Sequence, residues 1–333
     1  MFEILIAPFA SFLFTIFFIP KWIRKAKNFG LVGKDMNKFD KPEVAEAGGI
    51  VVIFGLLTGI FLYIFLETFF LHINVNTTLV FAAAMTVLLA GFIGFIDDIL
   101  GWKRGLKRWQ KPLLTLPIAI PLMVINAGES VMNIPVFGNV NFGIIYPLII
   151  VPIGIVGAAN GFNMLAGFNG MEAGMGAVAI GTMGTISLIK GELWLAVISF
   201  SAFASLLAFL VFNWFPAKIF PGDSLTYGTG AMIAVIAILG NMEKIGVILF
   251  LPFIIDAFWS LLPEARGGPK REAFGKPNRD GSLELPYEKL YGFEHFGIWL
   301  VKKIKKKAYE KDVTLFFICL ELLLSAIVLA FFA

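Results

Sequence analysis

Cysteine, histidine and charged residues are all scarce in this chain. Its one cysteine, Cys319, excludes a disulfide framework or a cysteine-ligated metal within one chain. Of its two histidines, neither His72 nor His295 lies in a pattern typical of a metal ligand or a catalytic base. Only 15% of the residues are charged, whereas 58% are hydrophobic, and the mean hydropathy is +0.85. This composition excludes a soluble globular domain and predicts a polytopic membrane protein.

Ten apolar segments follow one another along the chain, and each predicts a transmembrane helix. The first segment contains Glu3 and lacks both a basic region before it and a cleavage site of small residues, so we interpret it as a retained span. The ten segments are residues 3–22, 48–70, 79–96, 112–127, 144–159, 174–189, 193–212, 225–239, 245–262 and 313–333.

The basic residues are distributed unequally between alternate connections. One set of connections holds 25 of the 27 lysine and arginine residues, and the other holds only Lys190 and Lys244. The positive-inside rule places the basic set in the cytoplasm and both termini outside. The predicted fold is therefore an all-α polytopic membrane protein with ten transmembrane helices, small β-hairpin elements in its loops and the active site at the cytoplasmic face. One hairpin is predicted in residues 129–143, with Gly138-Asn139 as its turn.

The stretch from residue 91 to residue 111 joins an apolar run to two adjacent carboxylates and then five basic residues. Neighbours on a helix point about 100° apart, so Asp97 and Asp98 can border one cleft while having different roles. A membrane boundary explains the same pattern, because acids can end a span while basic residues extend to lipid head groups.

Two short polar connections offer further oxygen ligands. Asn160 and Asn163 share a helix face in a glycine-rich segment, and Asp223 and Ser224 follow a Pro-Gly turn. Together with the acid pair, these oxygens suit Mg²⁺ rather than zinc. Structural alternatives stay open here: the asparagines can join helices, and Asp223 or Ser224 can cap a helix.

The first and last cytoplasmic connections are the longest. Asp35, Lys38 and Glu46 lie in the first, where tethering by positive charge accounts for the lysine but not obviously for the acids. The last, residues 264–311 of a single membrane domain spanning 1–333, begins with basic residues that suit phosphate oxygens. These residues are Arg266, Lys270, Arg271, Lys276 and Arg279.

Two elements are predicted in the rest of that last connection. Residues 282–287 predict a short strand, and residues 292–311 predict an amphipathic helix whose aromatic face, including Phe293 and Phe296, lies against lipid. Its lysines then face anionic head groups as an anchor. Among ionisable residues inside spans, Asp256 is interpreted as lining the cleft and Glu321 has no assigned role.

Five motifs in this order carry a family resemblance. They are DMNK at 35–38, the acid pair with a basic loop ending at Lys111, NMLAGFNGMEAG at 163–174, FPGDS at 220–224 and GSLELPYEKL at 281–290. The chain resembles the polyprenyl-phosphate N-acetylhexosamine-1-phosphate transferase superfamily of the glycosyltransferase family 4 type. The likeness is closest to the UDP-GlcNAc:dolichyl-phosphate GlcNAc-1-phosphate transferases. The bacterial phospho-MurNAc-pentapeptide translocases share the architecture but differ in the asparagine motif and have a histidine-rich last loop.

The resemblance implies a transferase that moves GlcNAc-1-phosphate from UDP-GlcNAc to a polyprenyl or dolichyl phosphate and releases UMP. It implies Mg²⁺ as cofactor, with Mn²⁺ as an alternative, held by Asn163 and Asp223. The implied catalytic residues are Asp97, Asp98 and Lys111, and the implied substrate-binding residues are Lys38, Glu46, Asn169, Phe220, Arg266, Lys270 and Arg271. Asn169 would meet the uracil edge and Phe220 would stack on the base. The chain departs from the eukaryotic pattern where an Arg-His-Arg element is replaced by Pro269-Lys270-Arg271-Glu272.

Other readings remain at this stage. The same chemistry with another UDP-N-acetylhexosamine or with phospho-MurNAc-pentapeptide is one, and a secondary transporter is another, because broken helices are typical of transporters too. The expected partners are UDP-GlcNAc, the polyprenyl phosphate and the lipid bilayer, without nucleic acid, and a homodimer is kept open. We expect a multi-pass protein of the plasma membrane with its active site facing the cytoplasm, and an archaeal source is favoured.

Overall fold

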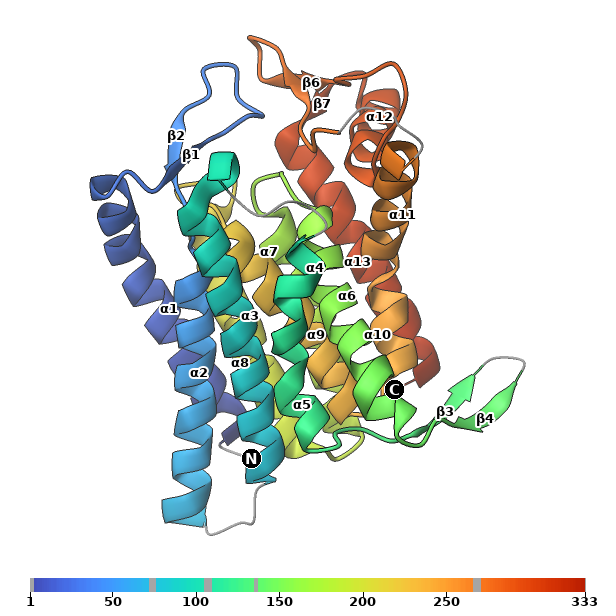
Figure 1. Cartoon of the computed structure of the whole chain (residues 1–333). Helices are drawn as coiled ribbons and strands as arrows, with labels where there is room; N and C mark the ends of the chain where they lie inside the picture. Colours follow the sequence, from blue (N-terminus) through green and yellow to red (C-terminus); the bar gives the residue numbers. More distant parts are fainter. Residues whose placement is uncertain (1–2, 72–75, 105–109, 135–136, 266–270, 333) are drawn as a thin grey trace.

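The computed structural model describes residues 3–71, 76–104, 110–134, 137–265 and 271–332. Within these residues the chain forms a bundle of helices with short strands at its two ends (Figure 1). The helical elements are α1 (Glu3–Asn28), α2 (Gly49–Leu66), η1 (Glu67–Leu71), α3 (Thr77–Arg104), α4 (Gln110–Thr115), η2 (Leu116–Ala119), α5 (Ile120–Val124), η3 (Tyr146–Ile150), α6 (Val151–Met164), α7 (Met171–Ile189), α8 (Leu193–Asn213), α9 (Gly222–Leu239), α10 (Glu243–Leu249), α11 (Leu251–Ala265), α12 (Phe293–Lys305) and α13 (Glu310–Phe332).

Eight helical segments of the described chain are long and apolar enough to cross a membrane. The pair α10 and α11 passes the same test together as a span bent by 60°, and residues Gln110–Val124 form a shorter apolar helix. Each of the ten predicted spans thus overlaps a helix, but the count of ten stays a prediction. The predicted span over 245–262 is bent rather than straight, because α10 ends at Leu249 and α11 begins at Leu251 with Pro252 in its first turn. Proline has no N–H to donate and its ring disfavours a continuous helix there.

Both ends of the chain lie at the same end of the bundle, where the hairpin of β3 (Val131–Ile134) and β4 (Gly138–Asn141) also lies (Figure 1). We call this the hairpin end. At the opposite end, which we call the pocket end, lie α12 and four short strands (Figure 1). These strands are β1 (Val32–Lys34), β2 (Glu43–Ala45), β6 (Ser282–Glu284) and β7 (Ala308–Tyr309). The pocket end carries the basic connections, so the arrangement has the polarity that the charge distribution predicts, while the side that faces the cytoplasm stays a prediction.

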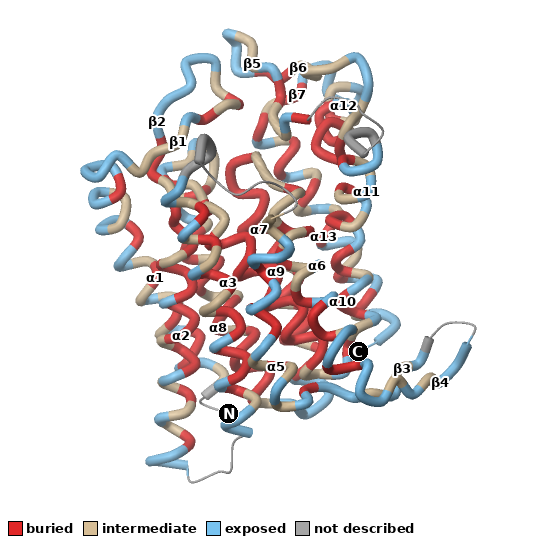
Figure 2. Tube along the Cα trace, in the orientation of Figure 1, coloured by how far each residue is buried: buried red, intermediate tan, exposed pale blue. Residues whose placement is uncertain are grey.

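The core of the bundle is centred on α9, which is the most buried of the spans (Figure 2). Glycines allow its neighbours to come close. A Cβ on Gly230 would lie 2.3 Å from the Ala158 carbonyl oxygen of α6, and a Cβ on Gly94 of α3 would lie 2.3 Å from the Asp223 carbonyl oxygen of α9. Close packing through small residues is typical of membrane helices. It brings the C-terminal turns of α3 and α6 to the start of α9.

Short antiparallel strands form the loops. They are β1 (Val32–Lys34) with β2 (Glu43–Ala45), β3 (Val131–Ile134) with β4 (Gly138–Asn141), and a sheet in which β6 (Ser282–Glu284) lies between β5 (Lys276–Pro277) and β7 (Ala308–Tyr309). The predicted hairpin in 129–143 and the predicted strand near 282 are confirmed. The predicted turn at Gly138-Asn139 is wrong, because Gly138 pairs with Ile134 and Asn139 with Asn133.

The predicted amphipathic helix is present as α12, but it ends at Lys305 and does not turn its whole aromatic face to lipid. Phe293 is buried against Phe317 of α13 with ring centroids 5.4 Å apart, and Phe296 contacts Phe316 at 6.4 Å. Trp299 and the neighbouring Ile304 do remain exposed. The predicted lipid face is therefore wrong for its first turn, because the last span offers those rings an aromatic partner.

Candidate active site

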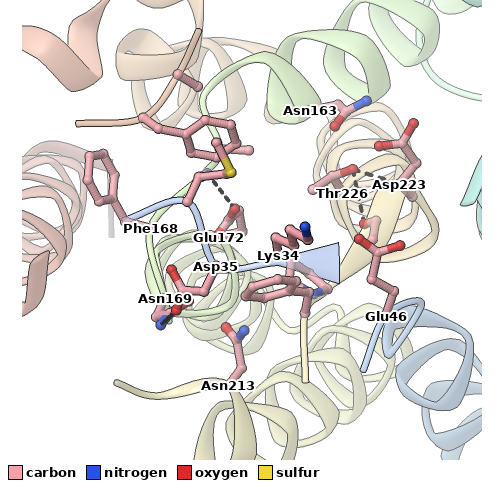
Figure 3. Close-up of a pocket in the computed structure, with 18 of the residues that line it drawn as sticks. Lys34, Asp35, Glu46, Asn163, Phe168, Asn169, Glu172, Asn213, Asp223 and Thr226 are labelled. Atoms are coloured by element: carbon pink, nitrogen blue, oxygen red, sulfur yellow. Dashed lines mark hydrogen bonds between the residues drawn. The ribbon is translucent and has the colours of Figure 1, made fainter. Parts of the chain in front are cut away.

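A pocket of about 310 Å³ opens at the pocket end. It is lined by the first loop, the end of α6 with the loop after it, the starts of α7 and α9, the end of α8 and the loop before β5 (Figure 3). Five predicted site residues line it: Glu46, Asn163, Asn169, Phe220 and Asp223. Segments far apart in sequence therefore meet here, as their interpretation as one site requires.

The two adjacent acids of α3 do have different partners. Gly94 brings α3 against the start of α9, and Asp98 lies one helical turn further on, facing the backbone of that start. Its carboxylate accepts hydrogen bonds from the N–H groups of Asp223 at 2.6 Å and Ser224 at 3.2 Å. Asp98 thus caps α9 from a neighbouring helix, and neither Asp223 nor Ser224 caps it through its own side chain.

Asp97 joins the site through a lysine. Lys111 Nζ lies 2.7 Å from Asp97 Oδ2 and 2.7 Å from Asp223 Oδ2. Asp97 is buried, whereas a quarter of the Asp223 side chain is exposed. Lys111 therefore links the buried acid behind the pocket to the acid on its wall, as a charge-assisted pair that neutralises one of the two carboxylates.

The start of α9 is fixed to the first loop by backbone hydrogen bonds. Ala45 and Ile219 form a parallel bridge, and Phe220 N–H donates to the Ala45 carbonyl at 2.7 Å. This pairing places Glu46 and Asp223 on one side of the pocket (Figure 3). Burial raises the pKa of the Glu46 carboxyl above its ordinary value, and the charge of Asp223 raises it further. Two carboxyl groups, those of Glu46 and Asp223, thus lie together on that wall, and Lys34 also lines the pocket.

The two asparagines at the end of α6 also separate. Asn163 lines the pocket near Asp223 (Figure 3). Asn160 points elsewhere, because its Nδ2 donates to Thr115 Oγ1 at 2.8 Å, which is the interhelical role that the sequence left open. Only Asn163 of the pair can therefore act on a ligand in this pocket.

Lys38 lies behind the pocket wall. Its Nζ pairs with Glu310 at the start of α13 and with Asp35 Oδ2 at 3.3 Å, and it lies 4.2 Å from the ring centroid of Phe215. Lys38 is not among the residues that line the pocket. In this structure it compensates the charge of two buried carboxylates.

Arg271 occupies a buried ion cluster outside the pocket. Its guanidinium donates to Asp256 at 2.6 and 2.9 Å, to the carboxylate of Glu294, and to the Met164 carbonyl at 2.9 Å. Asp256 was expected to line the cleft, and the structure instead buries it completely as the partner of Arg271. Arg266 and Lys270 lie outside the described residues.

Sequence reasoning gave no role to two acids that hold the loop between α6 and α7. Glu172 Oε1 accepts the N–H of Gly167 at 2.8 Å, and Glu310 Oε1 accepts the N–H of Asn169 at 2.8 Å. Both acids are buried. The signal that could have revealed them is an acid in the first turn of an apolar helix, where it can accept backbone N–H groups.

The donor set of the pocket fits a hard cation. Among the described residues no group of three or more His, Cys, Asp or Glu could hold a metal ion. Asn163 and Asp223 nevertheless supply an amide and a carboxylate oxygen to one pocket, and such oxygens suit Mg²⁺, which keeps several waters and binds few protein ligands when phosphates complete its shell. The residues present are thus compatible with the predicted cofactor.

Comparison with known proteins identifies the class. The model of glycosyl transferase family 4 matches residues 80–241, which include the acid pair, the asparagine motif and the start of α9. The chain belongs to this family.

The names of its relatives describe two transferase activities. A protein of Saccharolobus solfataricus with the provisional name UDP-N-acetylglucosamine–dolichyl-phosphate N-acetylglucosaminephosphotransferase is 35% identical over 94% of this chain and 91% of its own length. The Dictyostelium discoideum protein named for the same activity is 26% identical over 76% of this chain and 70% of its own. A phospho-N-acetylmuramoyl-pentapeptide-transferase of Streptococcus thermophilus is 30% identical, with 76% of each chain covered.

Proposed function

We propose that this protein transfers GlcNAc-1-phosphate from UDP-GlcNAc to a polyprenyl phosphate of the dolichyl type, releasing UMP and forming a lipid-diphosphate sugar. The Saccharolobus solfataricus relative, which aligns over 94% of this chain and 91% of its own length, has a provisional name that describes this transfer. The observation that supports it most directly is that Asn163 and Asp223 line one pocket, while Asp223 pairs with Lys111, which also pairs with Asp97. The diphosphate of a nucleotide sugar needs such a combination of cation ligands and fixed positive charge.

We further propose that Asn163 and Asp223 hold Mg²⁺. Three other carboxylates lie near Asp223, on Glu46, Asp97 and Asp98, and within the described residues Lys111 pairs with both Asp223 and Asp97. When bound, the ion would supply charge stabilisation to the oxygens of the leaving phosphate. The amide and carboxylate oxygens that Asn163 and Asp223 bring to the pocket support a cation at this wall.

The chain's own residues then have separable tasks. Asp98 fixes the N-terminus of α9 and so the position of Asp223, while Asp97 holds Lys111 at the pocket edge. Lys111 lies where it can neutralise a diphosphate oxygen. A non-bridging oxygen of the lipid phosphate attacks the β-phosphorus of the donor, the bond to the bridging oxygen breaks, and UMP leaves with that electron pair. A phosphate monoester is largely ionised near neutral pH, so a protein base is not required for the attack.

The setting follows from the apolar helices and the charge distribution. We propose a multi-pass protein of the plasma membrane whose pocket end faces the cytoplasm, where the basic loops would lie. The relatives of 35% and 34% identity that carry the dolichyl-phosphate name are archaeal, which supports an archaeal lipid acceptor.

The test is release of UMP by purified protein in detergent with Mg²⁺. UDP-GlcNAc, UDP-GalNAc and UDP-MurNAc-pentapeptide are compared, each with and without a polyprenyl phosphate. Release with UDP-GlcNAc only when the lipid is present is the expected result. Preferred use of UDP-MurNAc-pentapeptide would support the activity named for the Streptococcus relative instead. Absence of release with every donor would contradict the proposal and favour a transporter.

A further inference from the structure

Asn169 is held on three sides within the pocket wall. Its backbone N–H donates to Glu310 Oε1 at 2.8 Å, and its carbonyl accepts from Thr314 Oγ1 at 3.1 Å. Its side-chain Nδ2 donates to Asp35 Oδ2 at 3.0 Å. The residue is buried yet lines the pocket, so its fixed orientation decides which polar atom a ligand meets.

Asp35, the partner of the Asn169 side-chain amide, allows that amide only one orientation. Asp35 Oδ1 accepts the N–H of Asn37 at 3.2 Å, and Lys38 Nζ lies 3.3 Å from Oδ2, so the carboxylate is an acceptor on both oxygens. A carboxylate cannot donate to an amide oxygen, and Asn169 must therefore turn its NH₂ group toward Asp35. Within the described residues, no hydrogen bond uses Asn169 Oδ1. This oxygen is also not one of the side-chain atoms that are fully enclosed and lack a hydrogen-bond partner.

We infer that Asp35 is a positioning residue that makes the pocket selective for a nucleobase with a ring N–H. By fixing the amide of Asn169, it presents an acceptor oxygen to the ligand. Uracil offers a donor at its N3–H, whereas cytosine offers an acceptor at N3 and a donor only at its exocyclic N4 amine. An oxygen placed opposite N3 therefore attracts uracil and repels cytosine. The inference rests on the proposed function in one respect, namely that the donor is a uridine nucleotide.

The rest of the pocket is compatible with a base. Phe220 lies on the lining and provides an aromatic face, and stacking on such a face is tolerant of base identity. Selection must then come from the hydrogen-bonding edge. Leaving one buried polar group facing a mismatched base is costly, so loss of this contact should change affinity about tenfold to hundredfold.

The experiment measures nucleotide binding without turnover. Dissociation constants of UMP, CMP and 3-methyl-UMP are measured calorimetrically on the full-length protein in detergent with Mg²⁺. The wild type should bind UMP about tenfold to hundredfold more tightly than the other two. Equal binding of UMP and CMP, or no binding of UMP, would overturn the inference.

The variant Asp35→Asn frees the amide, because an asparagine can either accept from or donate to Asn169. We expect the ratio of CMP to UMP dissociation constants to fall toward one. The matched control is Thr314→Val, which removes a bond to the same residue but leaves its side-chain amide fixed, and its ratio should equal that of the wild type. A folded Asp35→Asn variant with the wild-type ratio contradicts the inference.

A second variant covers the case in which Asp35→Asn does not fold. Asn169→Ala removes the acceptor itself and should also abolish the preference, and a retained preference refutes the role of the amide. The two proposals fail differently: a protein that prefers UMP but releases none from any donor refutes the transferase reaction alone. Normal UMP release with an unchanged ratio in Asp35→Asn refutes only the role of Asp35.

Discussion

Two clusters of the described residues, in each of which one cation faces two carboxylates, differ in access. In the first, Lys111 lies between Asp97 and Asp223, about a quarter of the Lys111 and Asp223 side chains is exposed, and Asp223 lines the pocket. In the second, Arg271 lies between Asp256 and Glu294, and both carboxylates are fully buried. The same set of charges can therefore serve a ligand or hold helices together, and burial distinguishes the two.

The largest expected effect comes from breaking the closed cluster. Arg271→Met leaves Asp256 and Glu294 buried without their cation, and removing one partner of a buried pair typically costs about 3–5 kcal/mol. Chemical or thermal unfolding in detergent should report this loss. Lys302→Met is the matched control, because its pair with Glu284 is largely exposed and should change stability by less than about 1 kcal/mol. A stable Arg271→Met protein would contradict a structural role for this arginine.

Breaking the open cluster should affect turnover instead. Lys111→Met removes a charged donor at the pocket, and such a contact is worth about 1.5–3 kcal/mol, or about tenfold to hundredfold in rate. UMP release at saturating and limiting UDP-GlcNAc separates the effects on kcat and KM. Lys190→Met at the hairpin end serves as the control. If Lys111→Met lost stability but not activity, the two clusters would not differ in kind.

The two adjacent acids of α3, Asp97 and Asp98, can be separated in the same way. Asp98→Ala removes the acceptor for two N–H groups at the start of α9, and loss of a helix cap costs about 1–2 kcal/mol. Asp97→Asn should leave α9 in place and lower turnover through Lys111. Unfolding curves and UMP release, measured on both variants, check this division. Equal loss of stability in both variants would mean that Asp98 has no special structural role.

The smallest effect concerns the second carboxyl of the closed cluster. Burial and the charge of Asp256 raise the pKa of the Glu294 carboxyl, so the folded protein favours its protonated form. The stabilisation that the protonated Glu294 gives the folded state is complete below the unfolded-state pKa of 4.5. It is lost as the pH rises through the folded-state pKa.

Glu294→Gln keeps a donor toward Asp256 at every pH. The variant should therefore match the wild type at low pH and melt about 2–4 °C higher at pH 8, if the difference there is about 1 kcal/mol. Melting temperatures across the pH range give the result. A wild type that gains stability relative to the variant as the pH rises would contradict the sign.

Sequence patterns predicted the long apolar helices well, because a run such as residues 49–66 has no other stable form in a bilayer. They also predicted that Asp97 and Asp98 point apart, since this follows from helix geometry alone. They did not predict the partners of Arg271, because Asp256 and Glu294 approach it only through the packing of α11 and α12. The prediction of the hairpin turn was wrong for a local reason: Gly138 has a positive φ of 72° yet lies in a strand.

The hydrogen bonds that hold the Asn169 backbone also have a consequence for biosynthesis. Glu310 and Thr314, which bind its backbone, are 141 and 145 residues further along the chain, at the start of the last helix. Translation proceeds from the N-terminus, so this loop is made long before the residues that hold it. A nascent chain still lacking α13 has the polar side chains of this pocket but not the two contacts that hold the Asn169 backbone, so the loop can be fixed in place only after the final helix has been made.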